Sequence, residues 1–381
     1  MKLVVTGGGT GGHIYPALAI ADKFKEMEPD TEILYIGNEE GIEKEVVPKS
    51  GYPLELVDAR WIENTSPKQV LWTGARVVHG IEQSFRVLKK FKPDAIIGTG
   101  GYVCFPVLMA ARMIKCRKYL HEQNAFPGLA NRTLEKHVDN IFLGFGDAGQ
   151  YFKRPEKHVI AGNPVRKTFF TMSKREAREK LGIPQEDFVV FTFGGSLGAA
   201  RINDVAESLL ELFNGYKGVT LIVGTGRYYT ERMNQAICER NVDVKDNIRV
   251  MGYIDHMEYY LMACDLVISR AGALSVAETT VCGKASILIP SPNVTGNHQF
   301  YNAKAVSDRG GAILVEEKDL VIEKVVSDVL NLKNDREKLK AMSEASRACA
   351  PDKALDMIYE KVHENYLIDC GRSRRRKKDL K

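Results

Sequence analysis

The chain of 381 residues lacks the features that mark secreted, membrane-spanning and metal-binding proteins. Its opening residues, MKLVVTGGG, do not follow the order of a signal peptide, and no run approaches the roughly 18 apolar residues of a spanning helix. The seven cysteines form no CxxC pair and no Cys/His spacing suited to a metal. We therefore expect a cytoplasmic protein with reduced cysteines and no metal site.

Excess charge is also missing from most of the chain. The net charge is +5, but the segment 372–381 alone contains seven Lys/Arg and one Asp. The rest of the chain is close to neutral, whereas a nucleic-acid-binding protein needs basic residues spread over a face, so no nucleic-acid partner is expected. Two interpretations of the segment 372–381 remain open, a disordered solvated end or a basic patch that attracts anionic lipid.

What the chain has throughout is an alternation of short apolar runs with amphipathic stretches. Strand, helix and strand over such lengths predict an α/β fold with parallel sheets, helices on both faces, and ligands beyond the carboxyl ends of the strands. The predicted strands are 3–6, 32–36, 54–57, 95–98, 118–121, 140–143 and 159–161 in the first half, and 188–193, 220–223, 248–251, 266–269, 286–289 and 312–315 in the second.

Two domains are expected, because the chain is long enough to bury two cores. The N-terminal domain is predicted to span 1–163 and the C-terminal domain 164–350, with the turn Gly162–Arg166 as a hinge. A helix within 351–371 has no strand after it and is expected to pack back on the first domain, ahead of the basic end 372–381. The sequence thus predicts two Rossmann-like domains whose sheets face a cleft.

Each domain begins with a β-branched strand, a glycine-rich turn and a helix. The first copy starts at Lys2 (KLVVTGGGTGGH) and the second at Phe188 (FVVFTFGGSLGAAR). Glycine lets the backbone approach a ligand, and the N–H groups that open a helix suit a phosphate or another electron-rich group. The first turn lacks the GxGxxG spacing of dinucleotide-binding proteins, and a tight turn without a ligand is the alternative interpretation.

His13 lies in the first turn of the first predicted helix, where the helix dipole disfavours the charged imidazolium. A neutral imidazole beside a glycine cradle is suited to accept a proton, which makes His13 a candidate general base. Alternatively, His13 only caps or packs the turn. The polar run HEQNAFPGLANR, from His121 to Arg132, follows a strand and is either a ligand-contacting loop or a network of turn hydrogen bonds.

In the second domain, the pattern SRAGALSVAET from Ser269 to Thr279 predicts a nucleoside diphosphate site. Gly272 allows a close approach, and the helix from Ala273 offers N–H groups to a diphosphate. Glu278, one turn on, can accept hydrogen bonds from both hydroxyls of a ribose, although an ordinary exposed glutamate is the alternative. No DxD pair for a divalent ion occurs, so helix ends are expected to serve instead.

Four further residues are predicted near strand ends of this domain. Gln299 and Asn302 carry amides that can bond sugar hydroxyls, Arg166 can bond a base or phosphate, and the backbone at Ile254 can read a pyrimidine edge. Each alone is also explained by packing. Their joint position at one edge of a sheet favours a ligand site.

With these residues assembled, the chain resembles the MurG family, the lipid II-forming N-acetylglucosaminyltransferases of bacterial peptidoglycan synthesis, which have the GT-B glycosyltransferase fold. The resemblance implies that UDP-N-acetylglucosamine binds mainly to the second domain, while lipid I enters over the first, with no cofactor. It is carried, from the first strand to about Val315, by GGGTGGHIYPALA, GTGGYV, HEQNAFPGLANR, GNPVR, GGSLGAARIN, RAGALSVAE and PSPNVTGNHQFYNA.

The resemblance also implies roles for particular residues and an inverting attack by the C4 hydroxyl of the acceptor. His13 is the first choice of base and Glu122 the second, and no metal takes part. The implied substrate contacts are Thr10, Gly11, Gly12 and Asn124 on the donor's sugar and the acceptor side, Arg166, Ser196 and Ile254 on the nucleotide, Ala273 and Leu274 on the diphosphate, Glu278 on the ribose, and Gln299 on the N-acetylglucosamine.

Because the implied acceptor is tethered to a bilayer, we expect a peripheral contact with the anionic inner leaflet, on the cytoplasmic face of the cell membrane. The stretch 68–90 predicts a helix that is either a core helix with a solvated basic face or a membrane contact. Its expected buried stripe is Leu71, Ala75, Val78, Ile81, Phe85 and Leu88, and its expected outer stripe is Trp72, Arg76, His79, Arg86 and Lys90.

The competing interpretations share the two-domain shape. They are another GT-B transferase with a different nucleotide sugar or glycolipid acceptor, a sugar-nucleotide epimerase, and a nucleotide-binding module without catalysis. The last predicts UDP binding without turnover.

Overall fold

In the computed structural model, residues 1–59 and 67–379 are described, and the side chains of 67–75 and 372–379 are not. The chain divides into two compact units. Unit 1 contains Met1–Val165 and Asp352–Lys381, and unit 2 contains Arg166–Pro351. The expected boundary after Asn163 lies two residues earlier in the chain.

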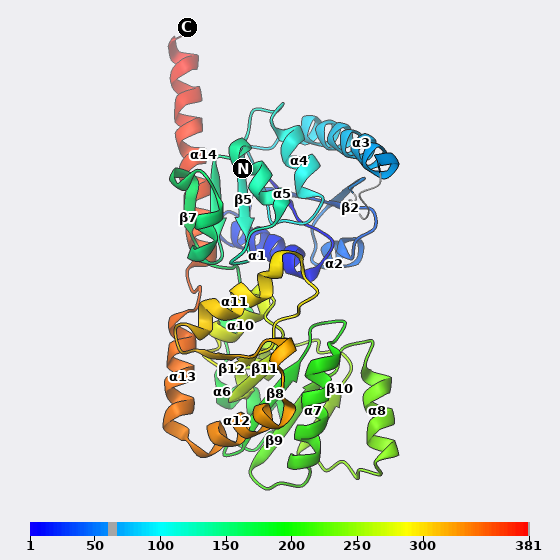
Figure 1. The fold of residues 1–381 in the computed structure, drawn as a ribbon. Coiled ribbons are helices and arrows are strands. Elements are labelled where there is room, and N and C mark those ends of the chain that lie inside the picture. Colours follow the sequence, from blue (N-terminus) through cyan, green and yellow to red (C-terminus); the bar gives the residue numbers. More distant parts are fainter. Residues whose placement is uncertain (60–66, 380–381) are drawn as a thin grey trace. The chain divides into compact units, whose positions relative to one another are not determined.

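Unit 1 contains a parallel sheet of seven strands in the order β3-β2-β1-β4-β5-β6-β7 (Figure 1). β-Branched and aromatic residues fill these strands, which lie between helices and are mostly buried. The strands are β1 (Lys2–Thr6), β2 (Glu32–Asn38), β3 (Leu54–Val57), β4 (Ala95–Gly98), β5 (Arg117–Glu122), β6 (Asn140–Leu143) and β7 (His158–Ile160). The helices are α1 (Gly11–Met27), α2 (Glu43–Lys49), α3 (Pro67–Phe91), α4 (Cys104–Ala111), α5 (Leu129–Leu134) and α14 (Ala354–Asp379).

Unit 2 contains a parallel sheet of six strands in the order β10-β9-β8-β11-β12-β13. Its strands are β8 (Phe188–Phe193), β9 (Val219–Gly224), β10 (Ile248–Met251), β11 (Leu266–Ser269), β12 (Ala285–Leu288) and β13 (Ala312–Leu314). Its helices are α6 (Lys174–Leu181), α7 (Ala200–Phe213), α8 (Thr230–Glu239), α9 (Met257–Ala263), α10 (Ala273–Val281), α11 (His298–Ser307), α12 (Ile322–Asn334) and α13 (Arg336–Ala348). Every predicted strand is found within two residues of its expected limits, which confirms the two parallel-sheet α/β domains.

Each sheet reverses its strand order once, between β1 and β4 in unit 1 and between β8 and β11 in unit 2. Loops that follow such neighbouring strands diverge to opposite faces of the sheet and leave a crevice at its carboxyl edge. The glycine-rich turns of the sequence follow β1 and β8, so both lie at these reversal points. The topology therefore places the predicted ligand-binding loops where open parallel sheets bind ligands.

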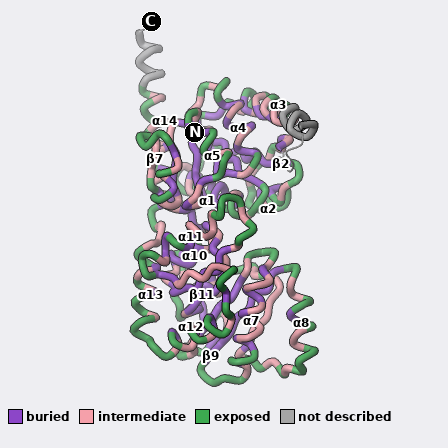
Figure 2. Tube along the Cα trace, in the orientation of Figure 1, coloured by how far each residue is buried: buried purple, intermediate pink, exposed green. Residues whose placement is uncertain are grey.

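Helix α14 returns to unit 1 and packs against α1. Ile358 and Val362 are buried in the core that includes Phe24, and the Phe24 and Tyr359 rings meet edge to face. Figure 2 marks the buried residues of each unit in purple along the backbone. Arg117, at the start of β5, donates from Nε to Asp369 at 2.6 Å. The backbone of α14 stays helical through Asp379, within the segment 372–381 for which a disordered end and a lipid-attracting patch were both left open.

Helix α3 corrects part of the predicted buried stripe. Leu88 is buried and Ile81 and Phe85 pack on the core, but the side chain of Val78 is 67% exposed, so the prediction was wrong there. The helix has 25 residues and is about 37 Å long. The predicted positions Leu71, Trp72 and Ala75 lie outside the described side chains.

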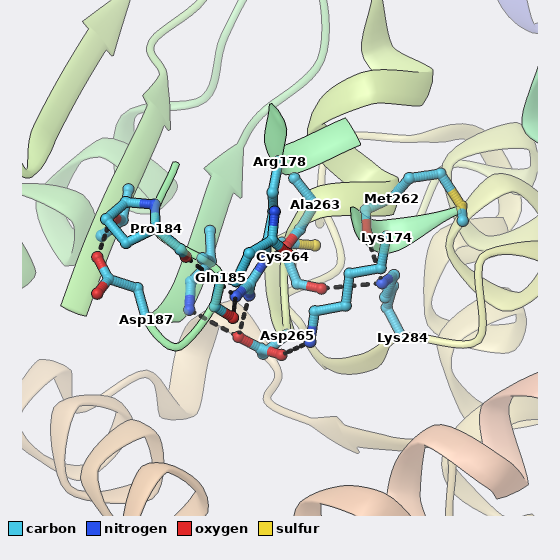
Figure 3. A network of polar contacts seen from close by, with 12 residues as sticks. Lys174, Arg178, Pro184, Gln185, Asp187, Met262, Ala263, Cys264, Asp265 and Lys284 are labelled. Atoms are coloured by element: carbon cyan, nitrogen blue, oxygen red, sulfur yellow. Dashed lines mark hydrogen bonds and ion pairs between the residues drawn. The ribbon is translucent and has the colours of Figure 1, made fainter. Parts of the chain in front are cut away.

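A network of charged side chains joins α6 to the amino edge of the unit 2 sheet (Figure 3). This edge lies opposite the edge with the glycine-rich turn. Arg178 of α6 is buried, donates to the carbonyl of Ala263 at 2.9 Å and pairs with Asp265 at 2.8 Å. The ammonium of Lys284 is buried beside it and donates to the carbonyls of Met262 and Cys264 at 2.8 and 2.9 Å. These bonds satisfy buried charges and give the network a structural role.

Within the described part of the chain, no helix is both long and apolar enough to cross a bilayer.

Candidate functional site

Two loops of unit 1 meet at the reversal point of its sheet. Thr6 of β1 lies beside Gly98 of β4, and the N–H of Gly8 donates to the carbonyl of Gly100 at 3.3 Å. Thr10, Gly11 and Gly12 form the start of α1 at this point, and the carbonyl of Thr10 accepts the N–H of His13 at 3.1 Å. The predicted residues of the first glycine-rich turn are therefore held together by backbone bonds.

His13 is positioned by the loop that follows β4. Its Nδ1 atom lies 3.0 Å from the carbonyl oxygen of Thr99 and 3.1 Å from Oε1 of Gln123. Gly100 has a φ of +103°, and a Cβ atom there would lie 2.6 Å from Nδ1 of His13, so a side chain at this position would displace the imidazole. The imidazole thus packs against the turn and has one defined orientation.

A buried carboxylate occupies the inner side of the first glycine-rich turn. Glu43 accepts hydrogen bonds from the N–H of Asn38 at 3.0 Å and from the N–H of Gly9 at 3.4 Å. A Cβ atom on Gly8 would lie 2.3 Å from its Oε1 atom. Because the carboxylate of Glu43 already accepts the N–H of Gly9, the first turn is poorly suited to a phosphate.

Glu122, the second choice of base, is a support for its own loop. It is buried, and burial raises the pKa of its carboxyl group. Oε1 accepts from the backbone N–H of Asn124 at 2.9 Å, and Oε2 accepts from Gly128 N–H at 3.1 Å and from the amide of Asn131 at 2.8 Å. With both oxygens engaged in these hydrogen bonds, Glu122 orders the loop that holds Asn124.

Unit 2 has a cavity of about 420 Å³ at the carboxyl edge of its sheet. Helices α7 and α10 both begin beside it, and their N-terminal N–H groups carry partial positive charge. The cavity also receives Gln299, whose Oε1 accepts the N–H of Ser291 at 2.9 Å. The lining is Gly194, Gly195, Gly198, Ala199, Ala200, Arg201, Tyr229, Arg270, Gly272, Ser275, Ser291, Asn293, Gln299 and Glu317.

One pair of charged residues in this lining was missed by the sequence analysis. Arg270 follows β11 and donates to the carbonyls of Ile289 and Pro290, each at 3.1 Å. Its Nη2 atom pairs with Glu317 at 2.5 Å. A cation directly after a strand that ends at the site was a visible signal for Arg270, but nothing in the sequence linked it to Glu317.

Arg166 and Glu278 lie in a second polar cluster of unit 2. Arg166 lies 3.6 Å from the carboxylate of Glu258. Burial raises the pKa of Glu278 to about 7, the positive charge of Arg166 opposes this rise, and Glu258 adds to it. Glu278 is therefore not the ordinary exposed glutamate of the alternative interpretation, and it is held in a site where its ionisation depends on its neighbours.

The remaining predicted residues of unit 2 differ in their surroundings. Asn302 is fully buried and its amide donates to the carbonyl of Ala271 at 3.1 Å, so it supports the loop before α10 and the prediction of a sugar contact was wrong. Ser196 lies exposed in the turn after β8, where its carbonyl accepts Arg227 N–H at 3.2 Å. Ala273 and Leu274 are the first two residues of α10, and Ile254 follows β10.

No grouping of three or more His, Cys, Asp or Glu side chains that could hold a metal ion is found among the described residues.

Residues 3–143 match the glycosyltransferase family 28 N-terminal domain, and residues 189–357 match the family 28 C-terminal domain. The UDP-N-acetylglucosamine--N-acetylmuramyl-(pentapeptide) pyrophosphoryl-undecaprenol N-acetylglucosamine transferase of Acetivibrio thermocellus is 40% identical over 365 residues, 96% of this chain and 98% of the relative. These matches confirm the resemblance found in the sequence.

Solved structures of proteins with different activities share this fold. The crystal structure of Acinetobacter baumannii MurG superposes with a TM-score of 0.72 at 24% identity, covering 94% of this chain and 99% of that one. A UDP-GlcNAc 2-epimerase from Neisseria meningitidis superposes with a TM-score of 0.70 at 16% identity, covering 96% and 100%. The fold alone therefore does not separate transferase from epimerase, whereas the sequence matches do. The chain is a glycosyltransferase of family 28 and belongs to the family of UDP-N-acetylglucosamine--N-acetylmuramyl-(pentapeptide) pyrophosphoryl-undecaprenol N-acetylglucosamine transferases.

Proposed function

We propose that this chain transfers N-acetylglucosamine from UDP-N-acetylglucosamine to the C4 hydroxyl of the N-acetylmuramyl residue of lipid I, with inversion at the anomeric carbon. The observation that carries the proposal is the cavity of unit 2, where α7 and α10 begin and Arg270 and Gln299 form part of the lining. The two helix N-termini and the cation of Arg270 can stabilise the negative charge of a diphosphate. The amide of Gln299 can form hydrogen bonds with the hydroxyls of a sugar.

In the proposed reaction, the bond between the anomeric carbon and the diphosphate oxygen breaks as the acceptor oxygen bonds to that carbon. The departing UDP oxygen becomes negative, and the N-termini of α7 and α10 stabilise this charge. Glu278 accepts hydrogen bonds from the ribose hydroxyls. Arg166 lies in the same cluster and contacts the nucleotide. The backbone after β10, at Ile254, reads the base, while Ser196, Ala273 and Leu274 contact the nucleotide and diphosphate.

His13 of unit 1 is the proposed general base for the acceptor hydroxyl. Its orientation is supported by the bonds of Nδ1 to Thr99 and Gln123. Thr10, Gly11, Gly12 and Asn124 are the proposed contacts of the reacting sugars. Glu122 is retained as a positioning residue, because its oxygens already accept hydrogen bonds from the loop.

The acceptor carries a lipid, so we place the enzyme at the cytoplasmic face of the cell membrane, in peripheral contact with the anionic inner leaflet. The contact is supported by Met113, which is 59% exposed, and by its basic neighbour Arg112. Burial lowers the pKa of His137, and the positive charges of Arg112, Lys136, Lys157 and Arg154 lower it further, so these four residues form one basic cluster. Arg76 contributes less, because it pairs with Asp58 at 3.5 Å.

The test is UDP release from UDP-N-acetylglucosamine in the presence of EDTA, with and without a short-chain lipid I analogue. We expect release only with the acceptor, and at an undiminished rate in EDTA. Release that is lost in EDTA would overturn the metal-free mechanism. UDP binding without release would overturn the acceptor assignment, and a parallel reaction with diacylglycerol would then test the glycolipid transferase.

A further inference from the structure

Three side chains of unit 1 form a chain of hydrogen bonds that ends at His13. Nε2 of His121 lies 2.9 Å from the carbonyl oxygen of Gly162. Nδ1 of His121 lies 3.0 Å from Nε2 of Gln123, and Oε1 of Gln123 lies 3.1 Å from Nδ1 of His13. Gln123 is 1% exposed, and its own carbonyl accepts the amide of Asn163 at 3.0 Å. His121 and Gln123 are therefore enclosed in the protein, His13 is half-buried, and the two ends of the chain are held by the carbonyls of Gly162 and Thr99.

The direction of every bond in this chain follows from its first link. A carbonyl oxygen only accepts, so Nε2 of His121 must carry the hydrogen that it donates to Gly162. Burial lowers the pKa of His121 to about 4, so its ring is neutral at neutral pH and Nδ1 holds a lone pair. That lone pair needs a donor, and the amide nitrogen of Gln123 supplies it.

With the amide nitrogen of Gln123 committed to His121, its oxygen must face His13. Nδ1 of His13 then lies between two oxygens, Oε1 of Gln123 and the carbonyl of Thr99 at 3.0 Å. Two acceptors around one ring nitrogen require that nitrogen to carry the hydrogen. In a neutral ring, the lone pair is then on Nε2.

We propose that Gln123, itself oriented by His121, is a positioning residue that holds His13 as the Nδ1–H tautomer, with Nε2 as the nitrogen that takes the proton from the acceptor hydroxyl. Once Nε2 is protonated, Oε1 of Gln123 stabilises the imidazolium through its bond to Nδ1–H. The proposal rests on the proposed function of His13 as the general base. It gives a neutral amide the place that a carboxylate holds in many histidine-containing catalytic groups.

A purely structural role for Gln123, in which the amide only fills a buried space, predicts different results. In that case, changes at position 123 alter stability but leave the titration of His13 in place. The other titratable groups near the loop include the thiol of Cys104, whose pKa burial raises to about 12, the carboxylate of Glu43 under Gly8, and the carboxyl group of Glu122, whose pKa burial also raises. These three groups are the same in all variants, so differences between variants report on position 123.

The first experiment is a direct measurement of the tautomer in the full chain labelled with ¹⁵N-histidine. The His13 signals are assigned by their loss in His13→Ala. We expect Nδ1 protonated and Nε2 unprotonated at a pH above the titration of His13. A neutral ring with the hydrogen on Nε2 would overturn the proposal, and the measurement does not depend on turnover.

The second experiment is the pH profile of kcat/KM for Gln123→Leu and Gln123→Glu. In Gln123→Leu, the hydrogen-bond acceptor for the imidazolium is lost, so the apparent pKa of the acid limb should fall by about one pH unit. In Gln123→Glu, a carboxylate stabilises the imidazolium, so this apparent pKa should rise. The size follows because a hydrogen bond to a charged group contributes about 1.5 kcal/mol, which corresponds to about one pH unit. Exposed Gln150 in the same unit provides matched controls, Gln150→Leu and Gln150→Glu, which should leave the limb in place.

Poor folding would reduce the amount of active enzyme without moving the limb, so the two effects are separable. If His13→Ala loses activity while both Gln123 variants keep the acid-limb pKa of the unmodified chain, the positioning role of Gln123 is overturned. The proposed role of His13 as general base would then be unaffected. If His13→Ala keeps its activity, the proposed function of His13 itself falls.

Discussion

Nη2 of Arg270 lies 2.5 Å from Oε2 of Glu317 in the lining of the unit 2 cavity. Arg270 also bonds two carbonyls at the end of β12, so its guanidinium is fixed from three sides. An anion that enters the cavity meets both a cation and a carboxylate. The ion pair is neutral as a whole, and removal of the arginine would leave the negative charge of Glu317 in the cavity lining.

Replacement of Arg270 by alanine should weaken UDP-N-acetylglucosamine binding by at least about tenfold, because it leaves Glu317 as an unneutralised carboxylate beside the diphosphate. The double variant Arg270→Ala with Glu317→Gln should recover part of that loss. Isothermal titration calorimetry of the unmodified chain and of these two variants measures the loss and its recovery. Equal affinities for the single and double variants would show that Glu317 does not influence the bound anion.

The affinity for UDP-N-acetylglucosamine should rise with pH. Glu278 must be ionised to accept two ribose hydroxyls, and its pKa is raised by burial to about 7. Binding is then reduced by the protonated fraction, which predicts about tenfold tighter binding at pH 8 than at pH 6. The sugar nucleotide is the suitable probe because its diphosphate does not titrate in this range. Glu278→Gln should bind more weakly and show a flat profile, and a slope that survives in this variant contradicts the assignment.

The raised pKa of Glu278 also makes the stability of the folded chain depend on pH. The pKa of Glu278 in the folded chain lies above that of an unfolded glutamate, about 4.3. Its contribution to the free energy of unfolding is therefore greatest at low pH and is lost as the pH rises through about 7. We expect the stabilisation of unit 2 by the bound sugar nucleotide, measured as a rise in Tm, to be larger at pH 8 than at pH 6.

Replacement of His13 by alanine should lower kcat by about 10²–10⁴, the usual contribution of a general base. The affinity for UDP-N-acetylglucosamine should stay nearly unchanged, because the donor cavity is formed by unit 2. Single-turnover measurement of transfer, together with calorimetry, separates the two quantities. Near-normal turnover in this variant would remove His13 from the chemistry.

The architecture could be predicted from the sequence because its signals are local. Runs such as Phe188–Phe193 are apolar and β-branched or aromatic, and each is bounded by glycine or polar residues, so their limits are visible without knowledge of contacts. The start of α10 at Ala273 was predicted for the same reason, since Gly272 marks the turn before it. The order of strands then follows from the rules of parallel sheets.

The site was predicted less completely because its bonds join distant parts of the chain. Gln123 stands in a run of four polar residues, and only the fold shows that it lies between two histidines. Glu122 was a candidate base by residue type, but its bonds to Asn131 depend on the path of the loop. The helical periodicity also predicted wrongly that Val78 is buried. Periodicity identifies the apolar face of a helix, but it does not show how far along the helix the core extends.

Removal of packing from α14 should destabilise unit 1 more than removal of its ion pair. Ile358→Ala should lower the free energy of unfolding by about 2–5 kcal/mol, since the side chain is fully buried. Asp369→Ala should lower it by less than about 1 kcal/mol, because the bond to Arg117 is partly exposed. Hydrogen exchange of the backbone amides of unit 1, measured at increasing urea concentration, follows the unfolding of this unit. A larger effect of Asp369→Ala would contradict the dominance of packing.

Charge reversal in the basic cluster of unit 1 should weaken binding to anionic vesicles. The double variant Arg112→Glu with Lys136→Glu removes two cations near His137, one of them the sequence neighbour of exposed Met113, and each basic residue near an anionic surface is worth about 1 kcal/mol. We expect at least about tenfold weaker co-sedimentation with vesicles that contain phosphatidylglycerol, and little binding of any variant to neutral vesicles or at high salt. Exposed Lys217 of unit 2 supplies the control Lys217→Glu. A separate deletion of 372–381 distinguishes the cluster from the basic end of the chain, and unchanged sedimentation of the double variant would mean that this face does not meet the membrane.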